Sequence, residues 1–192
     1  MRLYMIRHGA TRGNLESRYV GSTDEDLLDE SKRLLAGRSA PKAKRIYVSP
    51  MKRCLTTAEL LYPGKTKKII PGFAECRFGV FEYKNYQDLK GNEDYQRFID
   101  TFGECAIPGG ESRSAFCERC VLAMEAVFEE PEETDLALVV HGGTIMALLD
   151  HYSDPHRDYY EWQVENGGGF AMEAVRENGS VCFKNIARLD NM

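Results

Sequence analysis

The chain has 192 residues, of which 43% are hydrophobic and 29% charged, and its formal net charge is -5. This length and balance are typical of one globular domain, residues 1–192, with a substantial core. The negative charge argues against nucleic acid or an anionic membrane as the main partner, although a local arginine cluster can still bind a small anion.

Three features favour a cytoplasmic location. No apolar run approaches the roughly 20 residues that span a bilayer, and the first predicted strand begins at once, without the architecture of a signal peptide. The six cysteines, in a chain of this size and mixed character, are more typical of reduced thiols than of a secreted disulfide scaffold.

Short apolar runs bounded by turn residues alternate along the chain with apolar positions at helical spacing. In chain order, the predicted elements are a strand over 3–6, a helix over 27–35, a strand over 45–49, a helix over 51–61, a strand over 68–70, a helix over 112–130, a strand over 136–140, a helix over 144–152, and strands over 170–176 and 181–187. A loop is expected over 9–14, and Asn178-Gly179 predicts a hairpin turn at 177–179. The pattern predicts a three-layer α/β fold whose mixed, mainly parallel sheet is covered by helices on both faces.

Residues 73–110 interrupt this alternation. They are rich in aromatic and charged side chains with little clean periodicity, and they close with Pro108-Gly109-Gly110. An insertion at this place is expected to form a lid over the carboxyl ends of the strands. Its aromatic side chains are expected to pack inside the lid, with a pocket lining as the alternative; they are Tyr83, Tyr86, Tyr95 and Phe98.

Two of the four histidines follow predicted strands directly. His8 comes after the strand over 3–6, and His141 comes after the strand over 136–140. Ligand sites in α/β sheets gather outside the carboxyl ends of the strands. Two imidazoles delivered there from adjacent parallel strands would face each other across one crevice, which predicts an active site.

The residue types around these histidines suit phosphoryl transfer to a protein nucleophile. His8 can attack when one ring nitrogen is unprotonated, and His141, protonated beside a dianion, can donate to a nonbridging oxygen. Arg7 is a fork-shaped donor for phosphate, and Arg53 lies in the first turn of a helix whose N-terminus favours anions. Taken alone, Arg53 would more simply be a solvated surface cation and the histidines packed polar residues. The four together favour a site.

Five blocks of sequence occur in a recognisable order. They are Arg7-His8-Gly9-Ala10-Thr11, Ser49-Pro50-Met51-Lys52-Arg53-Cys54-Leu55-Thr56-Thr57-Ala58, Glu75-Cys76-Arg77-Phe78-Gly79-Val80-Phe81-Glu82, Pro108-Gly109-Gly110-Glu111-Ser112 and His141-Gly142-Gly143. In these blocks the chain resembles the histidine phosphatase superfamily, the phosphoglycerate-mutase-like group, over nearly its whole length. The resemblance implies a single histidine-phosphatase-like domain with the lid insertion at about 73–110.

The resemblance also implies a two-step hydrolysis through phospho-His8, without a metal or other cofactor. Arg7, Arg53 and His141 would hold the phosphoryl group, and Glu75 would protonate the leaving oxygen and then activate water. Asn14, at the family's usual distance from the first block, would assist. The alternatives are a solvated lid carboxylate for Glu75 and a helix-capping turn residue for Asn14.

Candidates for contact with the rest of the substrate come from the loops around the site. Gly21-Ser22-Thr23-Asp24 resembles a loop that lines the family's substrate entrance. We therefore expect substrate contacts from Thr11, Ser22, Thr23 and Gly142. The family's usual Trp-Glu-Gly is Phe81-Glu82-Tyr83 here, which predicts a lid of different shape.

The expected partner is a small phosphorylated substrate, bound by a monomer or homodimer. A compact phosphatase, such as the α-ribazole phosphatases that share this form, is the first reading. A phosphoglycerate mutase is the second, although mutases of this family are usually longer. A phospho-ligand binding protein without activity is the third, but it would be marked by loss of His8, Arg53 or Glu75. Cys117 and Cys120 form a CxxC inside a predicted helix without a second pair, so no metal site is expected.

Overall fold

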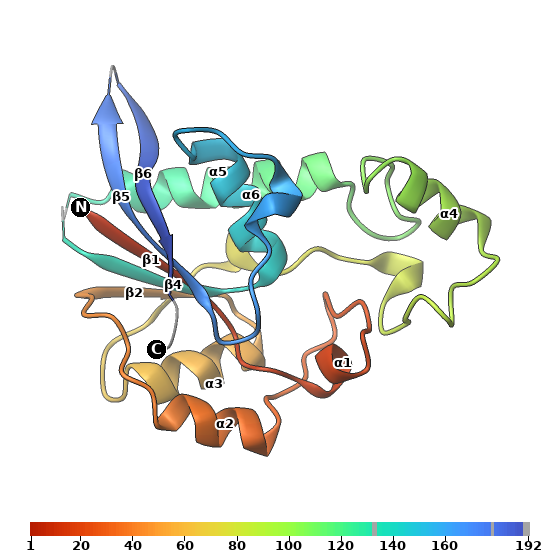
Figure 1. Ribbon diagram of the computed structural model, residues 1–192, viewed down its shortest axis with the longest axis horizontal. Coiled ribbons are helices and arrows are strands. Elements are labelled where there is room, and N and C mark those ends of the chain that lie inside the picture. Colours follow the sequence, from red (N-terminus) through yellow and green to blue (C-terminus); the bar gives the residue numbers. More distant parts are fainter. Residues whose placement is uncertain (132–133, 178, 190–192) are drawn as a thin grey trace.

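The computed structural model describes residues 1–131, 134–177 and 179–189. In these residues the strands form one six-stranded sheet with the order β3-β2-β4-β1-β5-β6 (Figure 1). The strands are β1 (Arg2–Arg7), β2 (Arg45–Val48), β3 (Lys68–Ile69), β4 (Leu136–Val140), β5 (Gly169–Glu177) and β6 (Ser180–Arg188). The pairs β1–β4, β4–β2 and β2–β3 are parallel, whereas β1–β5 and β5–β6 are antiparallel.

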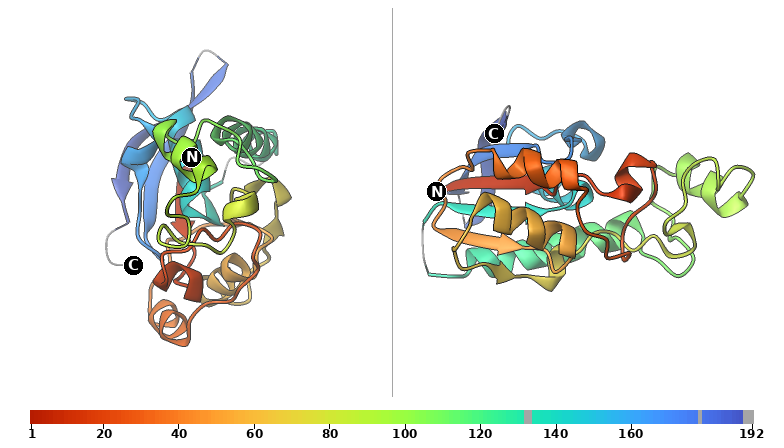
Figure 2. Two further views of the ribbon diagram at one scale, coloured as in Figure 1. Left: turned by 90° about the vertical axis from the view of Figure 1, so that its right-hand side faces the viewer. Right: turned by 90° about the horizontal axis from the view of Figure 1, so that it is seen from below.

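Helices cover both faces of this sheet, as Figures 1 and 2 show. The pair α2 (Asp29–Ala36) and α3 (Lys52–Leu61) lies on one face, and α5 (Arg113–Phe128) and α6 (Gly142–Tyr152) lie on the other. Each face has its own hydrophobic core against the sheet. The predicted three-layer α/β fold with a mixed, mainly parallel sheet is therefore confirmed.

The parallel pairing of β1 with β4 positions the histidines. Arg7 is in register with Val140, so that His8 and His141 leave the sheet side by side at its carboxyl edge. All five residues of β4 are buried, because helices cover this central strand on both sides. The prediction that the two histidine strands are parallel neighbours is confirmed.

The segment between β3 and α5 projects away from the sheet as the predicted lid (Figure 2, right). It contains the short 3₁₀ turns Pro71–Phe73 and Gly79–Phe81 and the helix α4 (Glu93–Asp100). A small core of its own holds it together, in which Phe81, Leu89 and Ile107 are buried. Tyr95 and Phe98 pack against this core as predicted, whereas Tyr86 is exposed.

Some elements differ from the sequence predictions. The expected loop over 9–14 contains the one-turn helix α1 (Arg12–Leu15), and α4 was not predicted inside the lid. Tyr95, Phe98 and Ile99 lie at helical spacing in α4, but the segment has only 8 residues and is polar at every other position, so it was not recognised as a helix. Asn178 of the predicted hairpin turn lies outside the described residues. No helix in the described ranges is long and apolar enough to cross a bilayer.

The base of the lid closes by a backbone approach at Gly79. Val80 N–H donates to Pro108 O over 3.0 Å, and Gly79 itself has a φ of +48°. A Cβ at Gly79 would lie 2.2 Å from Pro108 O, whereas a Cβ at Gly91, with φ +81°, would meet nothing within 4 Å. The two glycines thus share the left-handed backbone but not the close contact.

We expect Gly91→Ala to lower the free energy of unfolding by ~1 kcal/mol, the cost of the left-handed conformation alone. Gly79→Ala is expected to lower it by on the order of 3 kcal/mol, because the lid base must also shift. Urea unfolding of the two variants measures the difference. Equal losses of unfolding free energy in the two variants would show that the close contact between Gly79 and Pro108 does not stabilise the lid.

Candidate active site

His8 is presented as a neutral ring with one free nitrogen. Its Nδ1 lies 2.7 Å from Gly9 O, so Nδ1–H donates and Nε2 keeps its lone pair. Gly9 is fixed in turn, because its N–H donates to Thr57 Oγ1 of α3 over 3.0 Å. Burial, reinforced by the Arg53 charge, holds the pKa of His8 well below its ordinary value. The ring is therefore ready to act as a nucleophile.

His141 faces His8 at the start of α6. The two ring centroids are 5.2 Å apart, with the planes inclined by 68°. Arg53 Nε–H donates to His141 Nδ1 over 3.3 Å, which makes Nδ1 an acceptor, so Nε2–H donates to Ser49 Oγ at 2.6 Å. Burial, reinforced by the Arg53 charge, lowers the pKa of His141 well below its ordinary value. Without a bound anion, this ring is neutral.

Arg53 is not a surface cation, because its side chain is fully buried. Its Nη1 donates to Thr23 O over 2.8 Å, and its Nη2 donates to Gly21 O over 3.0 Å and Val20 O over 3.3 Å. Carbonyl dipoles and His141 thus compensate for the buried charge. This places a guanidinium next to both histidines.

Glu82 holds the same loop from the other side. Its Oε1 accepts from Gly21 N–H and Thr23 N–H, each over 2.9 Å. Burial alone would raise the pKa of Glu82, but these backbone hydrogen bonds outweigh it and lower the pKa. Residues 20–23 therefore lie between Arg53, which binds their carbonyls, and Glu82, which binds their amides. The sequence analysis gave Glu82 no role.

Arg7 brings a free donor to the site. Its Nη1 donates to Val164 O over 2.7 Å. Its Nε is buried and has no hydrogen-bond partner in the part of the chain that the structure describes. Gly142, the first residue of α6, lies against this guanidinium: a Cβ there would be 3.4 Å from Nε. An unpaired buried donor next to a helix N-terminus favours an anion.

Glu75 lies at the same helix N-terminus. Its Oε2 accepts from Gly143 N–H over 3.2 Å, and its Oε1 accepts from Cys76 N–H over 2.9 Å. A Cβ at Gly143 would lie 2.3 Å from Oε1, so only glycine allows this approach. Burial raises the pKa of Glu75, although the two amides and the charges of Arg53 and Arg7 oppose it. A proton is therefore retained on this carboxyl at higher pH than usual.

Asn14 takes part in capping a helix, which was the alternative to a role in phosphate binding. Its Oδ1 accepts from Thr11 N–H over 3.2 Å in the capping box of α1 and from Asn166 Nδ2 over 3.0 Å. Asn166, which the sequence analysis did not select, also donates to His8 O over 3.2 Å. These contacts fix the backbone beside the nucleophile.

A cavity of about 980 Å³ opens between the lid and the body of the protein. Arg7, Glu75 and Gly142 line it, whereas His8, Arg53 and His141 are buried behind them. Of the four candidates for substrate contact, only Gly142 lies on its wall. Thr11 is buried as the N-cap of α1, and Ser22 and Thr23 belong to the loop between Arg53 and Glu82, so their contact with substrate stays a prediction.

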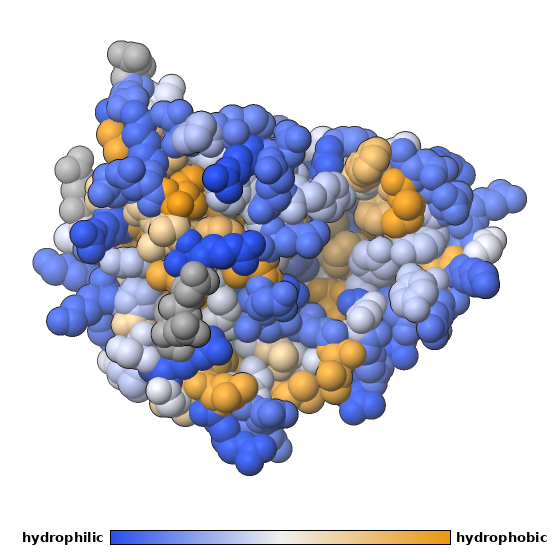
Figure 3. Space-filling view, viewed as in Figure 1, coloured by the Kyte–Doolittle hydropathy of each residue, from blue (hydrophilic) through white to orange (hydrophobic). Residues whose placement is uncertain are grey.

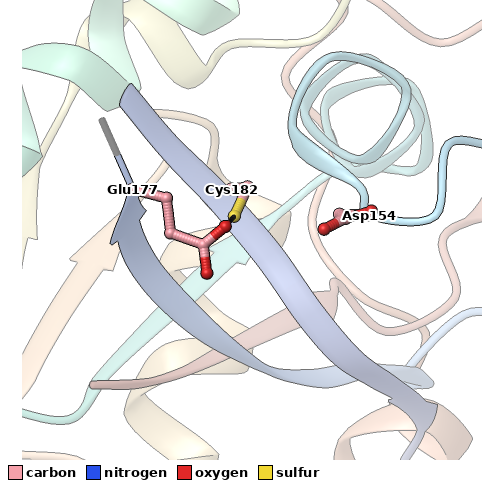
Figure 4. Close-up of side chains that lie close together, drawn as sticks. All are labelled: Asp154, Glu177 and Cys182. Atoms are coloured by element: carbon pink, nitrogen blue, oxygen red, sulfur yellow. Dashed lines mark hydrogen bonds between the residues drawn. The ribbon is translucent and has the colours of Figure 1, made fainter. Parts of the chain in front are cut away.

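Two groups of potential metal ligands lie elsewhere. Asp154, Glu177 and Cys182 come together on the surface (Figure 4), but Lys184 Nζ is 2.6 Å from Glu177 Oε1 and 3.5 Å from Asp154 Oδ2. An ammonium group therefore already compensates these carboxylates. The second group is the pair Cys117 and Cys120 in α5. Burial raises the pKa of Cys117 to about 11, which disfavours the thiolate that binds metals.

The position of Glu82 predicts an effect on Arg53. In Glu82→Gln the two charge-assisted hydrogen bonds from Gly21 N–H and Thr23 N–H become neutral and weaker, so the loop and Arg53 are held less firmly in place. We expect the dissociation constant of inorganic phosphate, measured by calorimetry, to rise about tenfold. Glu93→Gln, at an exposed lid glutamate, is the matched control. Equal behaviour of both variants would show that Glu82 does not position the site.

Comparisons with known proteins agree with this geometry. A sequence model of the histidine phosphatase superfamily (branch 1) matches residues 3–182. A probable phosphoglycerate mutase from Cronobacter sakazakii is 29% identical over 158 residues, which are 78% of this chain and 73% of the relative. An adenosylcobalamin/alpha-ribazole phosphatase from Salmonella typhimurium is 25% identical over 176 residues, 87% of either chain.

The fold has close counterparts among solved structures. An alpha-ribazole phosphatase from Shigella flexneri matches with a TM-score of 0.81 and 23% identity, over 96% of this chain and 95% of that one. At this identity, the likeness concerns the fold alone. The match to the family model covers nearly the whole chain, and the protein therefore belongs to the histidine phosphatase superfamily, branch 1.

Proposed function

We propose that this protein hydrolyses phosphomonoesters through a phosphohistidine on His8, without a metal ion. The observation that carries the proposal is the state of the His8 ring. Its Nδ1–H is committed to Gly9 O and its pKa is depressed by burial, which leaves Nε2 as an unprotonated nucleophile in the site. Arg53, within the same buried group, supplies a permanent positive charge.

The first step transfers the phosphoryl group to the enzyme. His8 Nε2 attacks phosphorus and forms the N–P bond while the P–O bond to the leaving alcohol breaks. The Nε–H of Arg7 and the N–H of Gly142, the first residue of α6, would bind the nonbridging oxygens. Glu75 gives its proton to the leaving oxygen, a role that its raised pKa supports.

The second step returns the enzyme to its starting state. Glu75, now a carboxylate, takes a proton from water while the water oxygen attacks phosphorus. The N–P bond breaks, phosphate leaves, and Glu75 is protonated again. A phosphate dianion beside His141 raises the pKa of that ring, so that it can donate to a nonbridging oxygen during both steps.

Hydrolysis is favoured over the two alternatives by the site itself. Glu75 lines a broad cavity that reaches the surface (Figure 3), so water has access to the phosphoenzyme, whereas a mutase must exclude it. A binding protein without activity has no need of a carboxyl with a raised pKa beside an unprotonated histidine. We further propose a cytoplasmic location, which the six free thiols support.

The proposal is tested by phosphate release from a panel of phosphomonoesters in EDTA. Wild type is expected to release phosphate, and His8→Ala to lose at least about 10³-fold in kcat, because the nucleophile is gone. His151→Ala, at an exposed histidine of α6, is the matched control and should keep full activity. Release abolished by EDTA, or retained by His8→Ala, would overturn the mechanism.

The pKa of Glu75 predicts the pH dependence. Burial raises this pKa, so the carboxyl is protonated in mildly acidic solution, and the rate should fall as pH rises through the raised pKa. Glu75→Gln is expected to lose this falling limb and ~10²-fold or more in kcat with glycerol 2-phosphate.

In kcat/KM, which reports the transfer to His8, the loss should be smaller with p-nitrophenyl phosphate, because nitrophenolate leaves without a proton. The second step needs Glu75 with either substrate. Profiles of kcat and of kcat/KM against pH for the two substrates measure both effects. A falling limb that persists in Glu75→Gln would show that another group is the general acid.

A further inference from the structure

The cavity beside the phosphate site has an apolar wall far larger than a phosphate needs. Four elements contribute to it: the end of α4, the turn Tyr159–Trp162, and the facing sides of α5 and α6. Its apolar lining includes Phe98, Ile99, Phe102, Phe116, Met146 and Tyr160. Hydrophobic side chains lie around the hollow between the lid and the body in Figure 3. An apolar cavity lining of this kind binds the uncharged part of a ligand rather than its charged group.

Several of these side chains remain open to solvent. Phe102 is 70% exposed, Ile99 46% and Tyr160 44%. Large apolar side chains exposed around a concave surface are typical of a binding site. Tyr160 O–H donates to Phe102 O over 3.0 Å, so the turn that carries Tyr160 holds the lid tip in place across the cavity.

The charges on the cavity wall do not call for a charged substrate body. Its lining includes three arginines and three glutamates. Arg113 is paired with Glu104 and lies over the Tyr160 ring at 5.7 Å from the centroid. Glu111 is paired with Arg119 at 2.8 Å. Of the three lining arginines, Arg113 is thus compensated and Arg7 lies at the phosphate end, while Arg188 donates to Gln163 O over 2.9 Å and shares the wall with Glu165.

Phe102 occupies a backbone position that normally belongs to glycine. At the end of α4, Gly103 N–H donates to Phe98 O and Phe102 N–H donates to Ile99 O, which is the Schellman arrangement. Phe102 is the left-handed residue of this motif, with φ +51°. A bulky residue is unfavourable there, and its ring gains little burial in return. The ring therefore serves something other than the stability of the lid.

We propose that the cavity takes a phosphomonoester whose body is a flat, uncharged ring system, and that Phe102 is a specificity-determining residue that contacts it. This inference rests on the proposed hydrolysis at His8. The phosphoryl group lies at the end lined by Arg7 and Gly142, and the ring body extends toward Phe102 and Tyr160. A three-carbon body would leave most of the cavity filled with water.

The test compares 1-naphthyl phosphate with glycerol 2-phosphate. Wild type is expected to have the lower KM for 1-naphthyl phosphate. Phe102→Gly should raise that KM roughly tenfold, leave the KM for glycerol 2-phosphate unchanged, and raise Tm, since glycerol 2-phosphate does not reach the ring and glycine suits the left-handed position. Tyr86→Ala, at an aromatic lid residue that is 62% exposed and does not line the cavity, is the matched control.

Binding of 1-naphthylmethylphosphonate, measured by calorimetry, tests the inference without turnover. The dissociation constant should rise in Phe102→Gly and stay unchanged in Tyr86→Ala. If wild type hydrolyses neither ester, the proposed function fails while this binding comparison still decides on the cavity. Equal changes for both esters, or unchanged binding in Phe102→Gly, would overturn the inference. A fall in Tm of Phe102→Gly would assign the ring to lid stability instead.

Discussion

The parallel pairing of β1 with β4 is the constraint on which the site depends. Because Arg7 is in register with Val140, the residues that follow them, His8 and His141, emerge at the same edge of the sheet. Both strands lie at the centre of the sheet under two helical layers, so this register is set by the packing of the core. The catalytic geometry is thus a consequence of the hydrophobic effect on two short apolar runs.

A second constraint is the buried guanidinium of Arg53. A charge without solvent must be compensated, and here three backbone carbonyls of residues 20–23 and the ring of His141 do so. Glu82 fixes the amides of the same loop, so the lid and the sheet edge are joined through it. The same arginine charge helps to keep His8 neutral, which couples the position of the loop to the reactivity of the nucleophile.

Sequence reasoning reached the strands, the main helices and the two histidines, because burial imposes a period on the residues of regular elements. It missed α4, a short helix whose residues are all at least partly exposed, and the capping role of Thr11, whose side chain accepts from Asn14 N–H. The sequence identified Glu82 only as part of a motif. Its role in holding the loop could not be predicted, because its partners are backbone amides, which carry no sequence signal. The left-handed Phe102 likewise breaks the local rule that would place glycine at a helix end.

The most direct test of the account is the mass of the enzyme during turnover. Wild-type protein mixed with a phosphomonoester and denatured rapidly should carry one phosphoryl group, which peptide mapping locates on His8. The adduct should be labile to acid, as a phosphoramidate is, and absent from His8→Ala. Phosphate release without any adduct, or an adduct on another residue, would contradict the central claim that His8 is the nucleophile.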